Sequence, residues 1–386
     1  MRRINPLISA TQAAMTPNPT YIHERLDWPT LHWNQRQLAP KLAEVRHAQG
    51  RLLGRMEGLG FLLREEAVLH TLTQDALKTS EIEGEILNAA AVRSSLARRL
   101  GMDIAGAVPS DRHVDGVVDM LLDATRNFEK PLTVERLYGW HAALFPTGRS
   151  GMNKISVGKW RNDTNGPMQV VSGPVGREKV HFEAPAAARL PAELAAFVRW
   201  ANTADDTDPV LRAAIAHFWF VTLHPFDDGN GRIARAIVDW ALARSEGSAQ
   251  RFYSMSAQIR AERTAYYDIL EQMQKSGPDI TTWMEWFLDC LGRAINGAEA
   301  TLSAVLQKAR FWERHGTHTF NDRQRRLLNK LLDGFEGKLT TSKWAAIAKC
   351  SQDTAQRDIQ GLVEMGILVK DAAGGRSTSY SVVEVG

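Results

Sequence analysis

The chain has 386 residues, of which 44% are apolar and 24% are charged. This composition supports a large buried core in two or three domains and excludes an intrinsically disordered chain. The 47 Lys and Arg residues nearly balance the 44 Asp and Glu residues, which gives a net charge of +3. This balance excludes a protein whose whole surface binds nucleic acid. Cys290 and Cys350 have neither metal-ligand spacing nor the pattern of a disulfide framework. No run approaches the roughly 18 apolar residues of a membrane span, so we expect a soluble protein of the reducing cytoplasm.

Extended, turn-rich sequence is expected before Pro40, and a helical region is expected after it. Apolar side chains recur at helical spacing between Pro40 and about Leu100. A second helical block is expected to begin near Ser110, and Thr133, which follows the break at Pro131, is a suitable N-cap for a further helix. We therefore expect a fold that is mainly α.

A different pattern occupies the segment from Ile155 to Pro185. Two short runs, Met168–Val171 and Lys179–Phe182, flank the turn-forming residues Ser172–Gly176. This arrangement predicts a β-hairpin. Helical spacing then recurs over Leu190–Trp200 and Val210–Leu223 and, after a break at Gly229–Gly231, continues to about Trp312.

The C-terminal segment has a pattern of its own. Three predicted helices are followed by two predicted strands, at Arg323–Leu332, Ser342–Lys349, Asp353–Met365, Ile367–Lys370 and Ser379–Val383. This order of elements is typical of a winged-helix domain. We therefore expect three domains, comprising an N-terminal helical region, a catalytic core and the winged helix, at 1–108, 109–315 and 316–386.

The sharpest signal for chemistry lies between His224 and Arg235, in the sequence HPFDDGNGRIAR. A helix is expected to end at the histidine, and a short loop of small residues leads into the next helix. Backbone N–H groups in such a loop, together with the positive end of the helix dipole, suit phosphate. Arg232 and Arg235 lie three residues apart on one face of that helix, where their guanidinium groups can grip further phosphate oxygens. The segment therefore predicts a site for several phosphate charges.

Three other side chains in this segment fit a phosphate site. Asp228 would repel phosphate unless a cation lay between them, and Mg²⁺ held by one carboxylate and phosphate oxygens is the usual arrangement. His224, whose ordinary pKa lies near neutrality, can take a proton from a hydroxyl nucleophile. Asn230 can donate to a phosphate oxygen as charge develops on it. Each residue alone is more often structural, so the prediction depends on the combination.

The same segment resembles the signature of the Fic family, His-x-Phe-x-(Asp or Glu)-Gly-Asn-Gly-Arg-x-x-Arg, and matches every fixed position. The resemblance implies a Fic-type helical bundle that transfers AMP from ATP to a Ser, Thr or Tyr hydroxyl of a protein and releases pyrophosphate. It implies that His224 is the general base, that Asp228 binds Mg²⁺ and that Phe226 anchors the loop. It also implies that the phosphates of ATP are held by Gly229, Asn230, Gly231, Arg232 and Arg235.

Two further segments resemble functional parts of Fic proteins. The predicted hairpin resembles the flap that holds a target segment by strand addition, formed here by Met168, Gln169, Val170 and Val171. A later stretch resembles the segment that lines the adenine pocket, and a flat ring from Tyr266 or Tyr267 could lie against adenine. An ordinary surface hairpin and ordinary packing of the tyrosines remain the alternatives.

An acidic turn resembles the inhibitory motif of Fic proteins, (Ser or Thr)-x-x-x-Glu-(Gly or Asn), with Thr79, Glu83 and Gly84 at the fixed positions. Local propensity alone predicts a helix end here, with Gly84 permitting the break. The resemblance implies that Glu83 pairs with Arg235 in the place of the γ-phosphate, so ATP binds weakly or with its α-phosphorus misaligned. The flanking residues resemble the N-terminal region of a bacterial Fic subfamily, so the resemblance covers most of the chain. We therefore expect an autoinhibited adenylyltransferase.

Two other functions stay open at this point. The same site can remove AMP, with Glu83 positioning water, or the chain can be a DNA-binding regulator whose Fic region senses nucleotide. The third helix of the winged helix would read DNA through its exposed positions, with Arg376 in the wing. The segment from Asn321 to Gly386, however, has a net charge of only +2, which is weak for binding several phosphates. Protein docking or a homodimer contact is the alternative for this domain.

The expected partners follow from this interpretation. ATP and Mg²⁺ are the small molecules, and the acceptor is a target protein or the chain itself. No membrane partner is expected.

Overall fold

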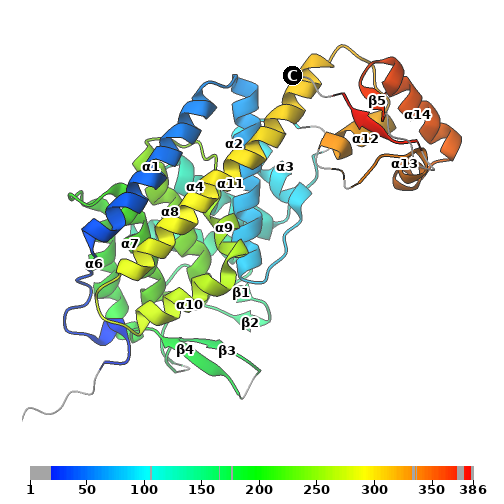
Figure 1. The fold of residues 1–386 in the computed structure, drawn as a ribbon. Helices are drawn as coiled ribbons and strands as arrows, with labels where there is room; N and C mark the ends of the chain where they lie inside the picture. Colours follow the sequence, from blue (N-terminus) through cyan, green and yellow to red (C-terminus); the bar gives the residue numbers. More distant parts are fainter. Residues whose placement is uncertain are drawn as a thin grey trace, which may run out of the picture. The chain divides into compact units, whose positions relative to one another are not determined.

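The computed structural model describes residues 19–104, 107–164, 166–174, 177–332, 335, 337–371 and 378–383. The chain divides into two compact units, the first comprising Met1–Arg51 and Val68–Ile295 and the second Leu52–Ala67 and Asn296–Gly386. Helices dominate each unit (Figure 1), which confirms the predicted mainly α fold. The domain limits expected from the sequence stay predictions.

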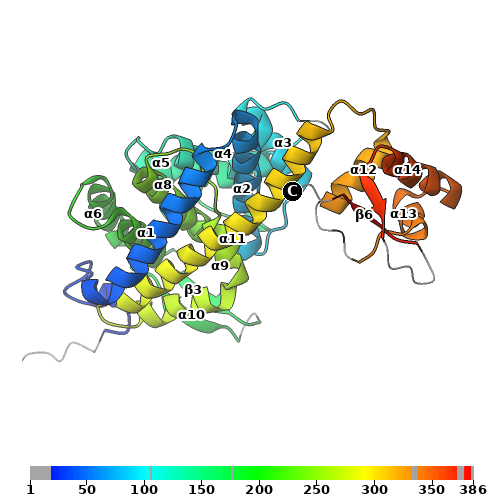
Figure 2. The same cartoon turned by 45° about the horizontal axis from the view of Figure 1, so that its top comes forward.

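Helices joined by loops make up most of the first unit (Figures 1 and 2). They are η1 (Ile22–Glu24), α1 (Gln35–Glu57), α2 (Phe61–Ile82), α3 (Ala89–Leu100), α4 (Arg112–Arg126), α5 (Val134–Leu144), η2 (Ala187–Arg189), α6 (Leu190–Asn202), α7 (Pro209–Leu223), α8 (Asn230–Glu246), α9 (Met255–Ala261), α10 (Arg263–Gln274) and α11 (Thr281–Arg314). Of these, α1, α2 and α11 also contribute residues to the second unit. The predicted cap is present, because the Thr133 side chain accepts from the N–H of Arg136 at the start of α5.

The helices α7 and α8 form the centre of the first unit and pack along each other. Most side chains of α7 are buried, as expected for a helix that is apolar on every side. Asp208 caps the N-terminus of α7 by accepting from the Val210 N–H, and α8 begins directly after Gly229. The packing of these two helices fixes the position of the loop between them, which is the centre of the predicted signature.

Two short hairpins accompany the helices. The first, β1 (Arg149–Ser150) with β2 (Asn153–Lys154), was not predicted, because two-residue strands carry no periodic signal. The second, β3 (Gln169–Ser172) with β4 (Lys179–Glu183), is the predicted hairpin and lies beside α10 in Figure 1. Two of its predicted turn residues, Val175 and Gly176, lie outside the described residues.

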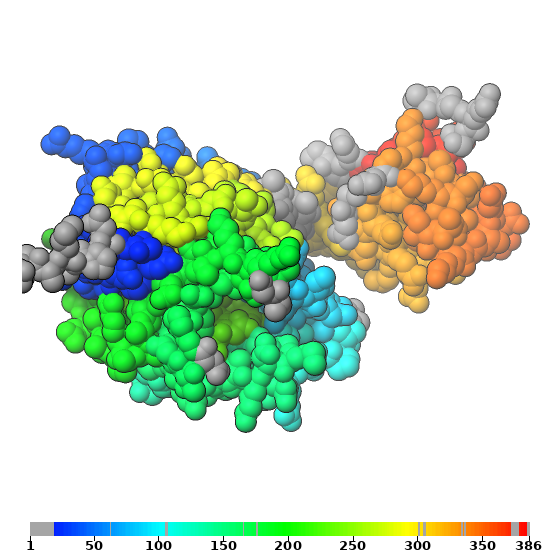
Figure 3. Space-filling model, turned by 90° about the horizontal axis from the view of Figure 1, so that it is seen from below, coloured from blue at the N-terminus to red at the C-terminus, as the bar shows by residue number. Residues whose placement is uncertain are grey.

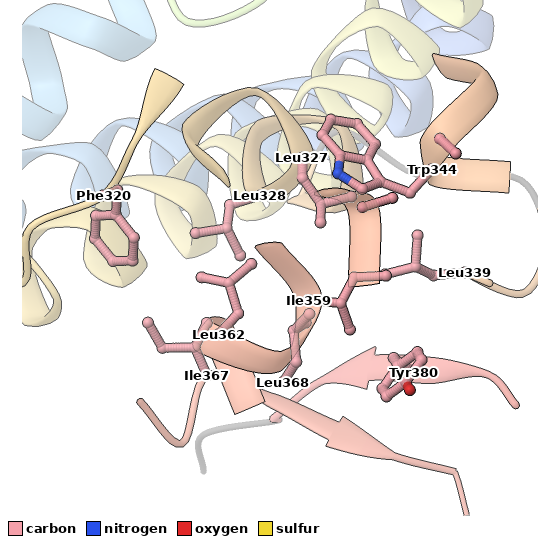
Figure 4. Close-up of a cluster of buried hydrophobic side chains, with 12 residues drawn as sticks. Phe320, Leu327, Leu328, Leu339, Trp344, Ile359, Leu362, Ile367, Leu368 and Tyr380 are labelled. Carbon is pink, nitrogen blue, oxygen red and sulfur yellow. The ribbon is translucent and has the colours of Figure 1, made fainter. Parts of the chain in front are cut away.

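The second unit has a small core of its own, shown in Figure 4. The elements around this core are α12 (Asp322–Leu332), α13 (Thr341–Ala348), α14 (Gln352–Glu364), β5 (Leu368–Lys370) and β6 (Tyr380–Val382). Buried side chains from these elements meet in one cluster that includes Leu327, Leu328, Trp344, Ile359, Leu362 and Leu368. The order of elements is the one expected for a winged helix, and that assignment stays a prediction. Arg376 and its neighbours in the predicted wing turn lie outside the described residues.

The exposed side of α14 carries charges of both signs. Arg357 is exposed, but so are Asp353 and Glu364. Asp358, in contrast, is buried and accepts from the Arg323 guanidinium at 2.7 Å. This mixed surface does not add to the weak positive charge of the segment, and DNA binding stays a prediction.

The structure also bears on two expectations from composition. Both cysteines are free. Among the helices described here, none combines the length and the apolar character needed to cross a membrane.

Candidate active site

A hollow of about 600 Å³ opens on the part of the first unit that carries β3 and β4. Figure 3 views this face, where the surface is recessed beside the green hairpin residues. Its lining comes from the turn after α2, both hairpin strands, the end of α7, the start of α8, and α10. The lining residues include Glu83, Met168–Ser172, His181, His224, Asp228, Asn230, Gly231, Arg235, Tyr266, Tyr267 and Glu271. The hollow thus brings together the four segments that the sequence singled out.

His224 ends α7 in the left-handed conformation, with φ 46° and its N–H donating to the Phe220 carbonyl at 3.1 Å. Arg161 holds this turn, because its Nε donates to the His224 carbonyl at 2.8 Å and its backbone N–H to the Pro225 carbonyl at 2.9 Å. The half-buried imidazole contacts the Val221 carbonyl through Nδ1 at 3.3 Å. Since a carbonyl only accepts, Nδ1 carries the proton and Nε2 keeps its lone pair. Burial lowers the pKa of His224 to about 4, so the imidazole is neutral at pH 7.

The loop between α7 and α8 is fixed from inside. Phe226 is fully buried and stacks on His141, with ring centroids 4.1 Å apart. The Asn230 amide accepts from the Phe226 N–H at 2.9 Å and donates to the Phe226 carbonyl at 2.8 Å. The amide nitrogen carries a second N–H, so these two bonds do not exclude donation to a phosphate oxygen, which stays a prediction. Gly229 has φ 80°, and a Cβ there would lie 2.8 Å from the Phe145 ring, so the position requires glycine.

Both arginines of the signature are almost fully buried, with 1% and 2% of their side chains exposed. The Arg232 Nη1 donates to Glu85 at 2.6 Å. The Arg235 Nε donates to the Thr79 hydroxyl at 2.8 Å, while Nη2 donates to the Thr79 carbonyl at 2.9 Å and to Glu83 Oε1 at 2.7 Å. Burial opposes the charge of Arg235, but Glu83 together with Tyr266 and Tyr267 outweighs burial, and the pKa of the guanidinium is raised.

The C-terminal turn of α2 supplies both glutamates. Gly84 has φ 85° and donates to the Glu81 carbonyl at 3.1 Å, and the Glu85 N–H donates to the Ser80 carbonyl at 3.0 Å. This is a Schellman motif, so the helix end predicted at Gly84 is present. The turn lets Glu83 and Glu85 reach different arginines of α8. The inhibitory role of Glu83 stays a prediction.

Asp228, the predicted ligand for Mg²⁺, keeps 41% of its side chain exposed. Its Oδ1 accepts from the Gly229 N–H at 2.5 Å, and its Oδ2 accepts from the hydroxyl of Ser150 on β1. Within the described part of the chain, no three His, Cys, Asp or Glu side chains are grouped in a way that could hold a metal ion. A single carboxylate nevertheless fits Mg²⁺, which usually takes its other ligands from substrate phosphates and water.

Tyr266 and Tyr267 differ in access. Tyr266 is 1% exposed, and its hydroxyl lies 2.8 Å from His217 Nε2. Tyr267 is 36% exposed, and the Arg263 guanidinium lies 5.3 Å from its ring centroid. Burial raises the pKa of both phenols. Of the two, Tyr267 has the ring surface available for stacking on a ligand.

The predicted flap comprises Met168 and the first three residues of β3. Gln169 and Val171 are exposed, whereas Met168 and Val170 are half-buried. As far as the chain is described, β3 pairs only with β4. The other edge of β3 therefore has main-chain groups available to a further strand. Strand addition by a target stays a prediction.

Several contacts at this site were not predicted from the sequence. Arg161 and Ser150 contact the loop between α7 and α8, and Glu85 contacts the first arginine of the signature. Arg161 and Ser150 reach the loop from a different part of the chain and belong to no fixed motif. Glu85 alone had a local signal, because it follows the inhibitory motif directly.

Known proteins resemble parts of this chain. Residues 131–242 match the Fic/DOC family, and residues 21–102 match a domain of unknown function, DUF4172. The chain is 47% identical over 55 residues to the protein adenylyltransferase fic-1 of Caenorhabditis briggsae, and 30% identical over 102 residues to the protein adenylyltransferase Fic of Drosophila ananassae. These matches span 14% and 26% of this chain and only 11% and 19% of the two relatives.

Two solved structures share the fold. A Fic family protein from Desulfovibrio desulfuricans G20 matches with a TM-score of 0.51 at 20% identity, over 90% of this chain and 96% of that one. A Fic domain containing signaling protein from Bacteroides thetaiotaomicron matches with a TM-score of 0.50 at 20% identity, over 67% of this chain and 97% of that one. Residues 131–242, which contain the signature, therefore form a Fic/DOC family domain in a chain that shares the fold of Fic proteins.

Proposed function

We propose that this chain is a protein adenylyltransferase, which transfers AMP from ATP to a protein hydroxyl and is held inactive by Glu83. One observation carries the proposal. His224, with a free Nε2, lines the same hollow as Arg235, whose buried guanidinium is bound by Glu83 at 2.7 Å. The similarity to proteins named adenylyltransferases supports the reaction class.

The start of α8 supplies a site for the triphosphate. Backbone N–H groups of the loop and the positive end of the helix dipole attract anionic oxygens. Arg232 and Arg235 add two guanidinium groups, which can bind phosphate oxygens in pairs. Holding the outer phosphates in this way would align the α-phosphorus with the rest of the hollow.

The chemical step uses His224 as the base. The acceptor hydroxyl gives its proton to Nε2 as its oxygen forms a bond to the α-phosphorus. The bond from that phosphorus to the oxygen that bridges to the β-phosphate breaks, and pyrophosphate leaves with the bonding electrons. The lowered pKa of His224 keeps the base free of a proton at neutral pH. Hydrogen bonding of Nδ1 to the Val221 carbonyl fixes the orientation of the ring.

Asp228 is the residue that would hold Mg²⁺, together with phosphate oxygens and water. When bound, the ion would offset negative charge on the phosphates. Ser150, which donates to Asp228, would orient this carboxylate.

Two further parts of the hollow would complete the site. The free edge of β3 would align a target segment through main-chain hydrogen bonds, with little demand on its sequence. The exposed ring of Tyr267 would stack on adenine.

The proposed brake acts by occupying an anion site. Glu83 Oε1 lies so close to Gly231 that a Cβ there would overlap it, so the carboxylate sits at the N-terminus of α8. This is the place where a helix favours negative charge. The γ-phosphate of ATP would compete with Glu83 for Arg235 and for this position.

The test is AMP transfer by the Glu83→Gly protein. With labelled ATP and Mg²⁺, we expect incorporation of AMP into protein, with release of pyrophosphate, to rise at least tenfold over the native chain. Glu81→Gly is the matched control, because it places the same residue in the same turn but removes a carboxylate that pairs with Lys78 and Arg260 instead. Equal incorporation by the native and Glu83→Gly proteins would exclude the brake, and no incorporation by either would exclude the transferase.

A further inference from the structure

Three side chains beside the hollow form a hydrogen-bonded row that the proposed transfer to a target does not use. Ser172 on β3 places its Oγ 2.6 Å from Nε2 of His181 on β4. The Nδ1 of His181 lies 2.5 Å from Oε2 of Glu271 on α10. A hydroxyl, an imidazole and a carboxylate in this order are the arrangement that activates a serine nucleophile.

A β-bulge sets the position of His181. The ladder pairs Val170 with Phe182 and Val171 with Val180, so His181 is an extra residue with no partner across the hairpin. Bulges of this kind redirect a side chain and occur often beside active sites. The contact of His181 with Ser172 therefore comes from a departure from regular pairing.

The proton positions follow from the partners. An ionised carboxylate only accepts, so His181 donates from Nδ1 to Glu271, and its Nε2, in the form without a proton, accepts from the Ser172 hydroxyl. The hydrogen bond from Lys275 at 2.6 Å, and then the one from His181, lower the pKa of Glu271 to about 2. The carboxylate is thus ionised at any working pH, and it would stabilise the imidazolium that forms when His181 takes a proton.

The hollow determines which electrophile this serine can meet. Ser172, His181 and Glu271 line the same cavity as His224 and Arg235. Under the proposed function this cavity holds ATP, whose α-phosphorus is the reactive centre. A nucleophile of the chain itself therefore faces the space in which AMP becomes available.

We propose that Ser172 is a self-modification site, which accepts AMP with His181 as its base. The inference rests on the proposed function. In this step the Ser172 Oγ forms a bond to the α-phosphorus, the bond from that phosphorus to the bridging oxygen breaks, and pyrophosphate leaves. The Ser172 proton moves to Nε2 of His181. The product is a phosphodiester on β3, the strand whose free edge would receive a target, so the modification would block docking.

The experiment maps AMP on the Glu83→Gly protein after incubation with ATP and Mg²⁺. Peptide mass spectrometry is expected to find AMP on Ser172, and Ser172→Ala is expected to remove it. Ser172→Thr keeps the hydroxyl and is expected to restore labelling in part. Thr164→Val is the matched control, because it removes an exposed hydroxyl that is not part of the lining of the hollow, and we expect it to leave Ser172 labelling unchanged. His181→Ala is expected to slow the labelling about 100-fold, the size of a lost general base.

A second measurement tests the nucleophile without ATP. A fluorophosphonate probe, which reacts with activated serines, is expected to label Ser172 in the native protein and not in His181→Ala. Absence of this labelling in the native protein would overturn the assignment of Ser172 as a nucleophile.

The two proposals can fail separately. If pyrophosphate is released and AMP is found only on residues other than Ser172, the inference is wrong and the transferase stands. If no pyrophosphate is released and no residue carries AMP although ATP binds, the proposed transferase function is wrong. The proposal that Ser172 accepts AMP is then wrong as well.

Discussion

The two sides of the hollow are built differently. On the α8 side, the guanidinium groups of Arg232 and Arg235 are almost fully buried, and each meets a glutamate from the turn after α2. On the hairpin side, Val171 and Val180 are 47% and 38% exposed, and β3 pairs on one side only. The α8 side is therefore a site of paired charges, and the hairpin side is a surface with main-chain groups available for hydrogen bonds.

This difference indicates where sequence changes should matter most. A buried charge depends on its partners, because removing one partner leaves the other unpaired in a medium of low polarity. An exposed pair depends little on its partners, because water replaces them. We therefore expect large effects from changes at the signature and small effects from comparable changes at the exposed side chains around it.

The largest effect is expected from His224→Ala. In the Glu83→Gly background, loss of the base should lower the rate of AMP transfer to a protein acceptor by about 10²–10⁴-fold. The affinity for ATP, measured by calorimetry, should change little, because the imidazole does not bind the phosphates in the proposed site. His47→Ala, which removes an exposed histidine of α1, is the control and should leave the rate unchanged. A rate within threefold of the parent would contradict the assignment of the base.

Next in size is the effect of the buried ion pair on stability. Arg235→Met should lower the free energy of unfolding of the first unit by about 3 kcal/mol, because Glu83 and the Thr79 carbonyl lose their donor. Lys275→Met removes an exposed pairing with Glu271 and should cost less than about 1 kcal/mol. Urea titrations of both variants provide the measurement. Equal losses would show that burial does not separate the two sides of the hollow.

Much of the fold and part of the site follow from local sequence. The end of α2 at Gly84 and the cap at Thr133 each depend on a few neighbouring residues, and both are as predicted. The contact between Arg161 and His224 spans 63 positions, so no local pattern predicts it. Asn230 shows a different limit, because its local sequence indicates a donor to phosphate but does not indicate the two hydrogen bonds with Phe226 by which the same amide closes the loop.

The pH dependence of transfer tests the environment of His224. Burial lowers its pKa to about 4, and the base works only when it is unprotonated. In the Glu83→Gly protein, the transfer rate should therefore stay level between about pH 6 and 8 and fall as the pH drops below about 5. Initial rates measured from about pH 4.5 to 8 provide the check. If lowering the pH already halves the rate near the ordinary pKa of histidine, the imidazole would be solvated and not buried.

The smallest effect is expected from Glu85→Gln. Glu85 is bound to Arg232 at 2.6 Å and to His113 at 3.2 Å, but 36% of its side chain is exposed. Burial raises the pKa of Glu85, yet His113 and Arg232 outweigh burial and lower it, so the carboxylate is charged at neutral pH and competes with phosphate for Arg232. A partly exposed pair contributes about 1 kcal/mol or less, so in the Glu83→Gly background the change should tighten ATP binding by at most about fivefold. Calorimetry with Glu81→Gln as the control gives the measurement. A gain in ATP affinity as large as that from Glu83→Gly would mean that both glutamates oppose ATP binding equally. The strength of this opposition would then depend on the burial of the arginine and not on the burial of the glutamate.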